Sequence, residues 1–184
     1  MSQADLARLV AEARAGNPDA WGEVYRELAP QVFRLCRRVL PTREDAEDAT
    51  GEIFLKVRLR LDRYDARRAF TPWLYRIAAN HCWDELRKRR SRRSVECGEA
   101  EEDELKSQDP GPHELLEAKR SRKQIRAALG RVDDRARLAL VLRYYAELSY
   151  QEIAEVLAVT PSFVGVLLWR ARRELRRLLR REEL

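Results

Sequence analysis

The sequence has few of the residues that build disulfide frameworks, metal sites or catalytic centres. It contains three cysteines and two histidines among 184 residues. Cys36, Cys82 and Cys97 form no CxxC pair and have no neighbouring histidine cluster, which argues against a disulfide framework and against a zinc site. A glycine-rich phosphate loop and a nucleophile motif are also missing. We therefore expect reduced thiols, no metal or cofactor, and no enzymatic activity.

Long apolar runs are absent as well. Charged residues interrupt every apolar stretch before it reaches the roughly 18 consecutive apolar residues that a membrane span requires. Nothing in the sequence resembles a signal peptide. We therefore expect a cytoplasmic protein without membrane insertion, long enough for one ordinary domain or two small ones.

The two signs of charge are nearly balanced in number but segregated along the chain. There are 37 basic and 31 acidic side chains, and the net charge of +6 is by itself weak evidence for a polyanionic partner. A basic run over residues 87–93 is followed by an acidic stretch, almost devoid of apolar side chains, that ends in Pro110-Gly111-Pro112. Such a stretch cannot bury a core and predicts a flexible linker. The expected organisation is an N-terminal domain at 1–94, a flexible acidic linker at 95–112 and a C-terminal domain at 113–184.

Start signals and apolar spacing indicate helices on both sides of this linker. At three places a hydroxyl that can cap free N–H groups is followed three residues later by an acid. Proline at a first helical position marks three further starts. The capping pairs are Ser2 with Asp5, Thr42 with Asp45 and Ser149 with Glu152, and the proline starts are Asn17-Pro18, Thr71-Pro72 and Thr160-Pro161. No run alternates convincingly with a period of two, so the predicted fold is all-α: an N-terminal helical bundle and a smaller C-terminal helical domain.

The helix expected over residues 42–61 has two different faces. Its apolar stripe should pack against neighbouring helices and consists of Ala46, Ala49, Ile53 and Val57. A second stripe carries Asp45, Asp48 and Glu52. These acids could simply complement the helix dipole near its N-terminus. Alternatively they contact a protein, since an acidic stripe would repel nucleic acid.

The helix expected over residues 72–89 has a mixed outward stripe. Its inner face is formed by Leu74, Ile77, Ala78 and His81, the last as a core or boundary histidine. Nearly opposite lie Arg76, Asn80, Trp83 and Arg87. Arginine binds phosphates, asparagine binds base edges and an aromatic ring stacks on an unpaired base, so this stripe suits single-stranded DNA. Lys88 and the rest of the basic run would continue the helix and neutralise phosphates. Phe70 and Trp73 lie at the approach to this helix, and we expect with equal weight that they belong to the buried core or to its surface.

A short capped helix, a tight turn and a long basic helix follow one another near the C-terminus. Residues 148–157 form the first helix, residues 158–160 the turn, and Pro161 opens the second helix. This is the order of a helix-turn-helix, whose second helix lies in the major groove of duplex DNA. Its expected buried stripe is Val164, Leu168, Ala171, Leu175 and Leu178. Its outward face has Ser162 and Val166 placed to meet base edges, then Trp169 and the phosphate-binding Arg170, Arg173, Arg176 and Arg177. The alternative is an arginine-rich surface helix that binds nothing in particular.

Three segments together carry a family resemblance. They are DAEDATGEIFL at 45–55, FTPWLYRIAAN at 70–80 and LRYYAELSYQEIA at 142–154. In this order, over nearly the whole chain, they resemble the signature segments of the extracytoplasmic-function (ECF) group of bacterial RNA polymerase sigma factors. The resemblance implies a transcription initiation factor that binds core RNA polymerase, directs it to specific promoters and helps open the DNA.

The resemblance also implies a role for each surface. Asp45, Asp48 and Glu52 would dock on the clamp helices of the polymerase β′ subunit. The stripe from Arg76 to Arg87, with Lys88, would capture the melted minus-ten strand. The linker would thread through the polymerase toward the RNA exit path. The C-terminal domain would read the duplex minus-thirty-five element while its other face meets the flap of the β subunit. An anti-sigma factor that clamps both domains is an expected further partner.

One segment departs from the family pattern. The recognition helix in such proteins commonly opens with a Gly-Thr-Val-Lys-Ser-Arg-like stretch, whereas residues 162–167 here read SFVGVL. Readout of the minus-thirty-five element would then rest on Ser162, on contact between Val166 and a thymine methyl group, and on the later arginines. Alternatively, this apolar opening packs on a protein, for which an anti-sigma factor is a candidate.

Two other interpretations stay open. An ordinary helix-turn-helix regulator explains residues 148–181 equally well but leaves the outward stripe of residues 76–87 without a purpose, and it would not bind single-stranded minus-ten DNA. A polymerase-binding adaptor would bind core enzyme without yielding promoter-specific transcripts.

Overall fold

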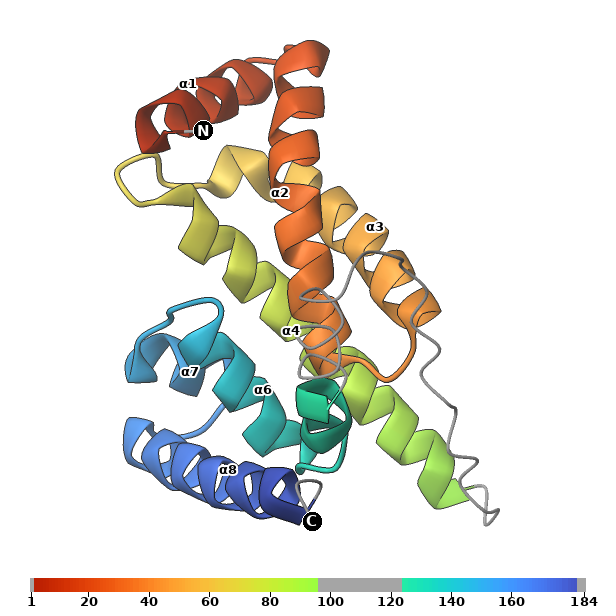
Figure 1. Cartoon of the computed structure of the whole chain (residues 1–184). Coiled ribbons are helices and arrows are strands. Elements are labelled where there is room, and N and C mark those ends of the chain that lie inside the picture. The colour runs from red at the N-terminus through yellow and green to blue at the C-terminus, as the bar shows by residue number, and fades with distance from the viewer. Residues whose placement is uncertain (1, 96–123, 182–184) are drawn as a thin grey trace, which may run out of the picture.

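The computed structural model describes residues 2–95 and 124–181, and the regular elements in both ranges are helices (Figure 1). The N-terminal lobe (residues 2–95) contains α1 (Gln3–Arg14), α2 (Pro18–Val39), α3 (Arg43–Arg60), the short 3-10 helix η1 (Leu61–Arg63) and α4 (Phe70–Val95). The C-terminal lobe (residues 124–181) contains a helical segment at 124–130, α6 (Asp134–Tyr144), α7 (Tyr150–Leu157) and α8 (Pro161–Arg181). No strand occurs in these ranges, and the predicted all-α fold is confirmed.

The predicted linker lies almost wholly outside the described residues. Of residues 95–112 only Val95 is described, and Cys97 is not. The boundaries of the two domains at residues 94 and 113 therefore stay predictions.

Side-chain caps fix where most of the helices begin. In α1, α3 and α7 the hydroxyl of Ser2, Thr42 or Ser149 accepts a hydrogen bond from the backbone N–H three residues on, at 3.1, 3.1 and 3.2 Å. The acid at that position accepts a hydrogen bond from the N-cap N–H in return, so all three predicted capping boxes are confirmed. The starts of α2 at Pro18 and of α8 at Pro161 are also as predicted.

The start predicted for α4 at Thr71-Pro72 is wrong, because the helix begins at Phe70. The first four N–H groups of a helix have no intrahelical partner, so proline is tolerated at the third position as well as the first. The far end runs to Val95. The basic run therefore continues the helix, as predicted.

The core of the N-terminal lobe lies where α2 meets α3 and α4. α2 also packs against α1, and α3 packs against α4. The most deeply buried side chains include Val24, Val32 and Leu35 of α2, Ile53 and Val57 of α3, and Leu74 and Ala78 of α4. Each buried leucine, isoleucine or valine stabilises the fold by about 1.5–3 kcal/mol relative to an exposed one. The predicted inner faces of α3 and α4 are confirmed.

Two of the cysteines belong to this core. Cys36 of α2 and Cys82 of α4 are fully buried, with their Sγ atoms 3.7 Å apart. Contact with the Cys36 thiol, followed by burial, raises the pKa of the Cys82 thiol. A thiol that stays protonated and out of solvent is a packing group rather than a nucleophile.

The C-terminal lobe contains the predicted helix-turn-helix, with α6 packed against both of its helices. The turn begins at Ala158, whose φ of 51° places it in the left-handed region at the end of α7. Within the predicted inner stripe of α8, Val164, Leu168, Ala171 and Leu178 are buried and Leu175 is half-buried. Leu167 is also buried, although the predicted stripe did not include it.

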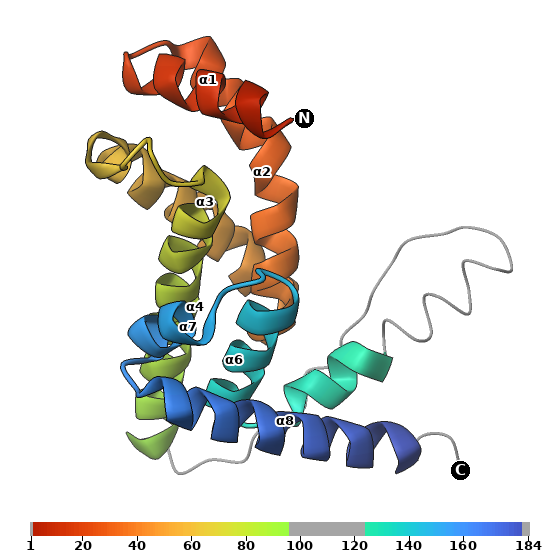
Figure 2. The same ribbon diagram turned by 90° about the vertical axis from the view of Figure 1, so that its left-hand side faces the viewer.

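The two lobes pack directly against each other. α6 contacts both α2 and α4, and α7 contacts α4. In Figure 2, α7 lies across α4, and α6 runs beside α4. The buried side chains of both lobes form one continuous cluster. The C-terminal lobe therefore covers part of the surface of α4.

Candidate nucleic-acid and protein interfaces

The outward side of α4 carries the residues predicted to bind single-stranded DNA. We call them the α4 stripe: Arg76, Asn80, Trp83 and Arg87. Asn80 and Arg87 are exposed, whereas Arg76 and Trp83 are half-buried. The opposite face of the helix supplies the core, so the α4 stripe lies outside the N-terminal bundle. Lys88, beside the stripe, is exposed and donates a hydrogen bond to Glu85 Oε1 at 2.7 Å.

Residues of the C-terminal lobe cover part of the α4 stripe. Arg76 forms an ion pair with Glu155 of α7. The guanidinium of Arg135 on α6 lies 5.0 Å from the centroid of the Trp83 ring. The stripe thus faces away from its own bundle and toward the other lobe.

An aromatic cluster lies at the start of α4. The ring centroids of Tyr64, Phe70 and Trp73 are 5.2–5.5 Å apart. Phe70 is buried, as in its core assignment, but Trp73 is only half-buried. Because Trp73 lies two turns before Asn80 on the same side of α4, its accessible edge extends the α4 stripe.

His81 lies under the α4 stripe as the predicted core histidine. Its side chain is buried, with Lys56 Nζ 2.6 Å from Nδ1 and a carboxylate oxygen of Glu52 3.9 Å from Nε2. Burial, followed by the nearby Lys56 ammonium, lowers the pKa of His81. The neutral ring accepts the hydrogen bond from Lys56. Within residues 2–95 and 124–181, no group of three or more His, Cys, Asp or Glu side chains could hold a metal ion.

The acidic stripe of α3 divides into two parts. Asp48 and Glu52 are exposed. Asp45, by contrast, is half-buried and already engaged: one carboxylate oxygen accepts from the Thr42 N–H and hydroxyl, and the other pairs with Arg89 of α4. The structure therefore joins Asp45 to the fold, whereas Asp48 and Glu52 stay exposed, Glu52 with a carboxylate oxygen 4.0 Å from Lys56 Nζ.

Two leucines continue the line of these outer acids, and the sequence prediction missed them. Leu55 and Leu59 are 64% and 82% exposed, and their spacing of three and seven residues from Glu52 places them on the same side of α3. We call Asp48, Glu52, Leu55 and Leu59 the acid–leucine strip. Exposed leucines beside acids suit a protein partner, not DNA. The signal was present in the sequence as two apolar residues outside the buried stripe.

The outward face of α8 is open along its length. All of its predicted contact residues are exposed, namely Ser162, Val166, Trp169, Arg170, Arg173 and Arg177. The guanidinium of Arg173 lies 5.4 Å from the Trp169 ring centroid. The exposed face of α8 therefore carries apolar groups, Val166 and Trp169, toward its start and arginines from Arg170 onward.

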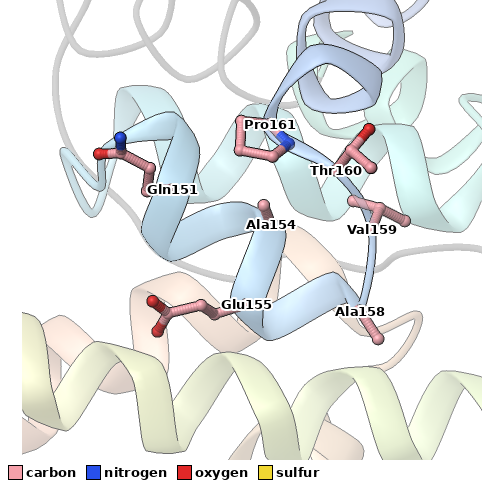
Figure 3. Close-up of a pocket in the computed structure, with 7 residues that line it drawn as sticks. All are labelled: Gln151, Ala154, Glu155, Ala158, Val159, Thr160 and Pro161. Carbon is pink, nitrogen blue, oxygen red and sulfur yellow. The ribbon is translucent and has the colours of Figure 1, made fainter.

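A shallow hollow lies where α7 turns into α8. Figure 3 shows Glu155 on α7 close to α4, with Gln151 one turn earlier and Thr160 and Pro161 across the hollow. The Thr160 hydroxyl accepts from the Phe163 N–H at 3.2 Å, which caps α8. Glu155, the acid that pairs with α4, thus lies close to the start of α8.

Within the described ranges, no single helix is long and apolar enough to cross a membrane. α7 and α8 pass such a test only as a joined pair, and they are bent by 92° at the turn between them.

Taken together, a helical bundle with an arginine, amide and tryptophan stripe on α4 and an exposed acid–leucine strip on α3, packed on a helix-turn-helix, is the arrangement expected of a two-domain DNA-binding protein. Two family models match the chain: "Sigma-70 region 2" over residues 24–92 and "Sigma-70, region 4" over residues 122–175. The first of these covers α3 and most of α4, the part that an ordinary helix-turn-helix regulator does not explain.

Curated relatives agree with these matches. The chain is 26% identical to the ECF RNA polymerase sigma factor SigW of Bacillus subtilis, covering 95% of this chain and 97% of the relative. It is 34% identical to the ECF sigma factor SigE of Mycolicibacterium smegmatis, covering 85% of this chain but 60% of that relative. The fold is similar to that of the sigma factor RpoE of Bartonella quintana, solved with the anti-sigma factor NepR. That match has a TM-score of 0.68 and 19% identity, and covers 86% of this chain and 96% of the other.

The chain belongs to the ECF group of RNA polymerase sigma factors. It directs RNA polymerase to promoters and helps initiate transcription there, and its relatives are not catalytic enzymes.

Proposed function

We propose that residues 1–94 bind core polymerase and capture the minus-ten strand, that residues 113–184 read the minus-thirty-five element, and that residues 95–112 link the two. The observation that carries this division is the α4 stripe, an arginine, amide and tryptophan surface outside the bundle core. In this proposal the nucleotidyl transfer belongs entirely to the polymerase. The factor acts in the bacterial cytoplasm, where the polymerase and the chromosome are.

In the minus-ten role, each member of the α4 stripe has its own chemistry. Asn80 can donate to and accept from a base edge, and Trp83 offers a ring on which an unstacked base can lie. Arg76, Arg87 and Lys88 bind the backbone phosphates. Trp73, two turns before Asn80 on α4, adds a second aromatic edge.

For polymerase docking we propose the acid–leucine strip of α3 against the clamp helices of β′. Leu55 and Leu59 supply apolar area at the contact, and Asp48 and Glu52 supply charge that orients it. Asp45 supports this surface from inside, since it caps α3 and ties it to Arg89 of α4. The flap of the β subunit would contact the C-terminal lobe.

For the minus-thirty-five element we propose that α8 enters the major groove. Ser162, Val166 and Trp169 would face bases, with Val166 against a thymine methyl group. Arg170, Arg173 and Arg177 would bind phosphates. Because the RpoE neighbour was solved with an anti-sigma factor, we also propose that an anti-sigma factor regulates this protein.

The test of the whole assignment is run-off transcription with purified core polymerase and a promoter library. We expect transcripts from a subset of promoters that share two short elements. Core binding without any promoter-specific transcript would instead favour an adaptor. Binding of a duplex operator without any core binding would favour an ordinary regulator.

The docking surface has its own test. Asp48→Arg should weaken core binding by about tenfold, because a desolvated like-charge contact at an interface costs on the order of 1–2 kcal/mol or more. Glu47→Arg is the matched control, because Glu47 lies on the same helix, is exposed and is outside the strip. Affinity should be measured by fluorescence anisotropy, with helicity checked by circular dichroism. Equal affinities for both variants would remove this strip as the docking site.

A further inference from the structure

A cleft of about 470 Å³ lies where α4, α6 and α8 meet. Leu86 of α4 and Leu167 of α8 line it with buried apolar side chains. Two aromatic residues line it as well, Trp83, which is half-buried, and Phe163, which is 37% exposed. Small-molecule sites usually have volumes of about 300–1,000 Å³. The cleft therefore has the size and the apolar lining of a ligand site.

Four arginines line the same cleft, two from α4 and one each from α6 and α8. They are Arg87, Arg90, Arg135 and Arg170. Arg87, Arg90 and Arg170 are exposed, and no carboxylate in the described part of the chain lies within ion-pair distance of them. Arg135 is half-buried, and its guanidinium lies 5.0 Å from the centroid of the Trp83 ring. Positive charge from three helices thus converges on one cleft.

Two aspartates also line the cleft, but both already have donors within the fold. Asp133 caps α6, where its Oδ1 accepts from the N–H groups of Arg135 and Ala136 at 3.1 and 3.2 Å. Asp134 pairs with Arg137 at 2.6 Å. Because the arginines outnumber these engaged carboxylates, the cleft attracts anions.

The walls of the cleft are held by the core that the two lobes share. α6 packs against both α4 and α8, and Leu86 and Leu167 belong to the continuous buried cluster. A site whose walls are fixed before the ligand arrives loses less conformational entropy on binding. The cleft is therefore a preformed feature of the packed molecule.

The lining suits a ligand that has both an aromatic ring and phosphate groups. Arginine binds phosphate oxygens through two parallel N–H donors. An aromatic side chain stacks on the face of a base. Because the Arg135 guanidinium already lies over Trp83, Phe163 is the ring that this geometry leaves for a base. A lipid or a bare inorganic anion would use only one of these two features.

We propose that this cleft binds a free purine nucleotide with two or three phosphates. The base stacks on Phe163, and Arg90 and Arg135, together with Arg87 and Arg170, bind the phosphates. This inference goes beyond promoter recognition and does not rest on it. Its test needs neither a promoter nor the polymerase.

The test measures ligand binding to the full chain by isothermal titration calorimetry. The probes are ATP, inorganic tripolyphosphate, which has the phosphate chain without the base, and a single-stranded DNA decamer. Physiological salt screens unspecific attraction between the basic chain and an anion. Thermal unfolding with ATP is the second measurement, because a ligand that binds only the folded protein raises its melting temperature. Circular dichroism shows whether each variant keeps its helicity.

The contribution of the base is tested at Phe163. We expect the native protein to bind ATP about tenfold more tightly than tripolyphosphate, because stacking adds to the charge attraction. Phe163→Ala should weaken ATP binding about tenfold and leave tripolyphosphate binding unchanged. Phe163→Tyr keeps an aromatic ring and should stay within about twofold of native affinity for both probes.

The contribution of the phosphates is tested at the arginines. Arg90→Ala with Arg135→Ala should weaken binding of ATP and of tripolyphosphate by about tenfold, because it removes two charged donors. The matched control is Arg58→Ala with Arg60→Ala, which removes two exposed arginines of α3 that do not line the cleft. Because its sites are distant, the control should leave both affinities within about twofold of native.

Two results would overturn the nucleotide site. One is the absence of ATP binding and of any rise in melting temperature; if the decamer then binds in a Phe163-dependent way, the cleft belongs to a DNA strand. The other is equal affinity for ATP and tripolyphosphate that Phe163→Ala does not change, which would make the cleft a simple polyanion site. Neither result bears on Arg76 and Asn80 as minus-ten contacts, because neither residue lines the cleft.

Discussion

α4 and α8 both present a tryptophan and several arginines outward, but in different settings. On α4 the tryptophan is half-buried beneath Arg135 and stands beside an amide, Asn80. On α8, Trp169 is 55% exposed beside Arg173. The first surface is partly covered by the other lobe, through Glu155 and Arg135. The second is a cation-rich face whose predicted contact residues are all exposed. We therefore expect α4 to govern promoter opening and α8 to govern salt-dependent affinity for the duplex.

The largest expected effect is on α4. Asn80→Ala with Trp83→Ala should reduce promoter opening by about 10- to 100-fold, because stacking on an aromatic ring contributes about 1–3 kcal/mol per base. Permanganate reactivity of unpaired thymines at a responsive promoter measures opening. Core affinity should stay native, and Asp84→Ala, an exposed change on the same helix, is the control. Equal loss of opening and core binding would contradict a role specific to melted DNA.

The next effect is on α8. Arg173→Ala with Arg177→Ala should weaken binding to all duplexes alike, and the slope of log affinity against log salt should become shallower by about 2. Titration of duplex DNA at several salt concentrations measures this slope. Arg26→Ala, an exposed change on α2, should leave the slope unchanged. A loss confined to one DNA sequence would mean that these arginines read bases, and the contrast with α4 would fail.

What the sequence predicted well was local. The three capping boxes and the alternation of inner and outer residues along α3, α4 and α8 depend on side chains three or four positions apart, which spacing reveals directly. The proline in α4 misled because an unpaired first turn accepts it at more than one position. Leu55 and Leu59 were missed because they lie outside the buried apolar stripe of α3, on the same side as the outer acids, where apolar residues carry no periodic signal of a core.

What the sequence could not predict was contact between distant segments. Arg76 meets Glu155 across 79 residues and Arg34 meets Tyr145 across 111. Neither pair has a spacing signal, because their meeting depends on how the two lobes pack. The same holds for Asp45, whose pairing with Arg89 turns a predicted surface acid into a structural one. The partial burial of Arg76 and Trp83 could therefore be seen only in the tertiary structure.

A smaller effect should separate base reading from phosphate binding on α8. If Val166 touches a thymine methyl, replacing that thymine by uracil should weaken native binding about fourfold, since one buried methyl contributes about 0.8 kcal/mol. Val166→Ser should be insensitive to the same replacement. Duplex competition assays on a promoter from the run-off library measure both. Sensitivity retained in the variant would assign the methyl contact to another residue and leave Val166 with a protein-facing role.

The smallest effect concerns the support of α4. The folded-state pKa of His81 is lowered, so the unfolded chain binds a proton more readily, and the stability from neutral His81 is present above its ordinary pKa near 6.5. It is lost as pH falls through the lowered folded value, at no more than about 1.4 kcal/mol per pH unit for one proton. Urea unfolding at pH 7.5 and 5.5 should show this loss, and His81→Gln should reduce it. An unchanged pH dependence in the variant would mean that burial and the Lys56 ammonium do not disfavour protonation of His81. The pH response would then arise elsewhere in the lobe.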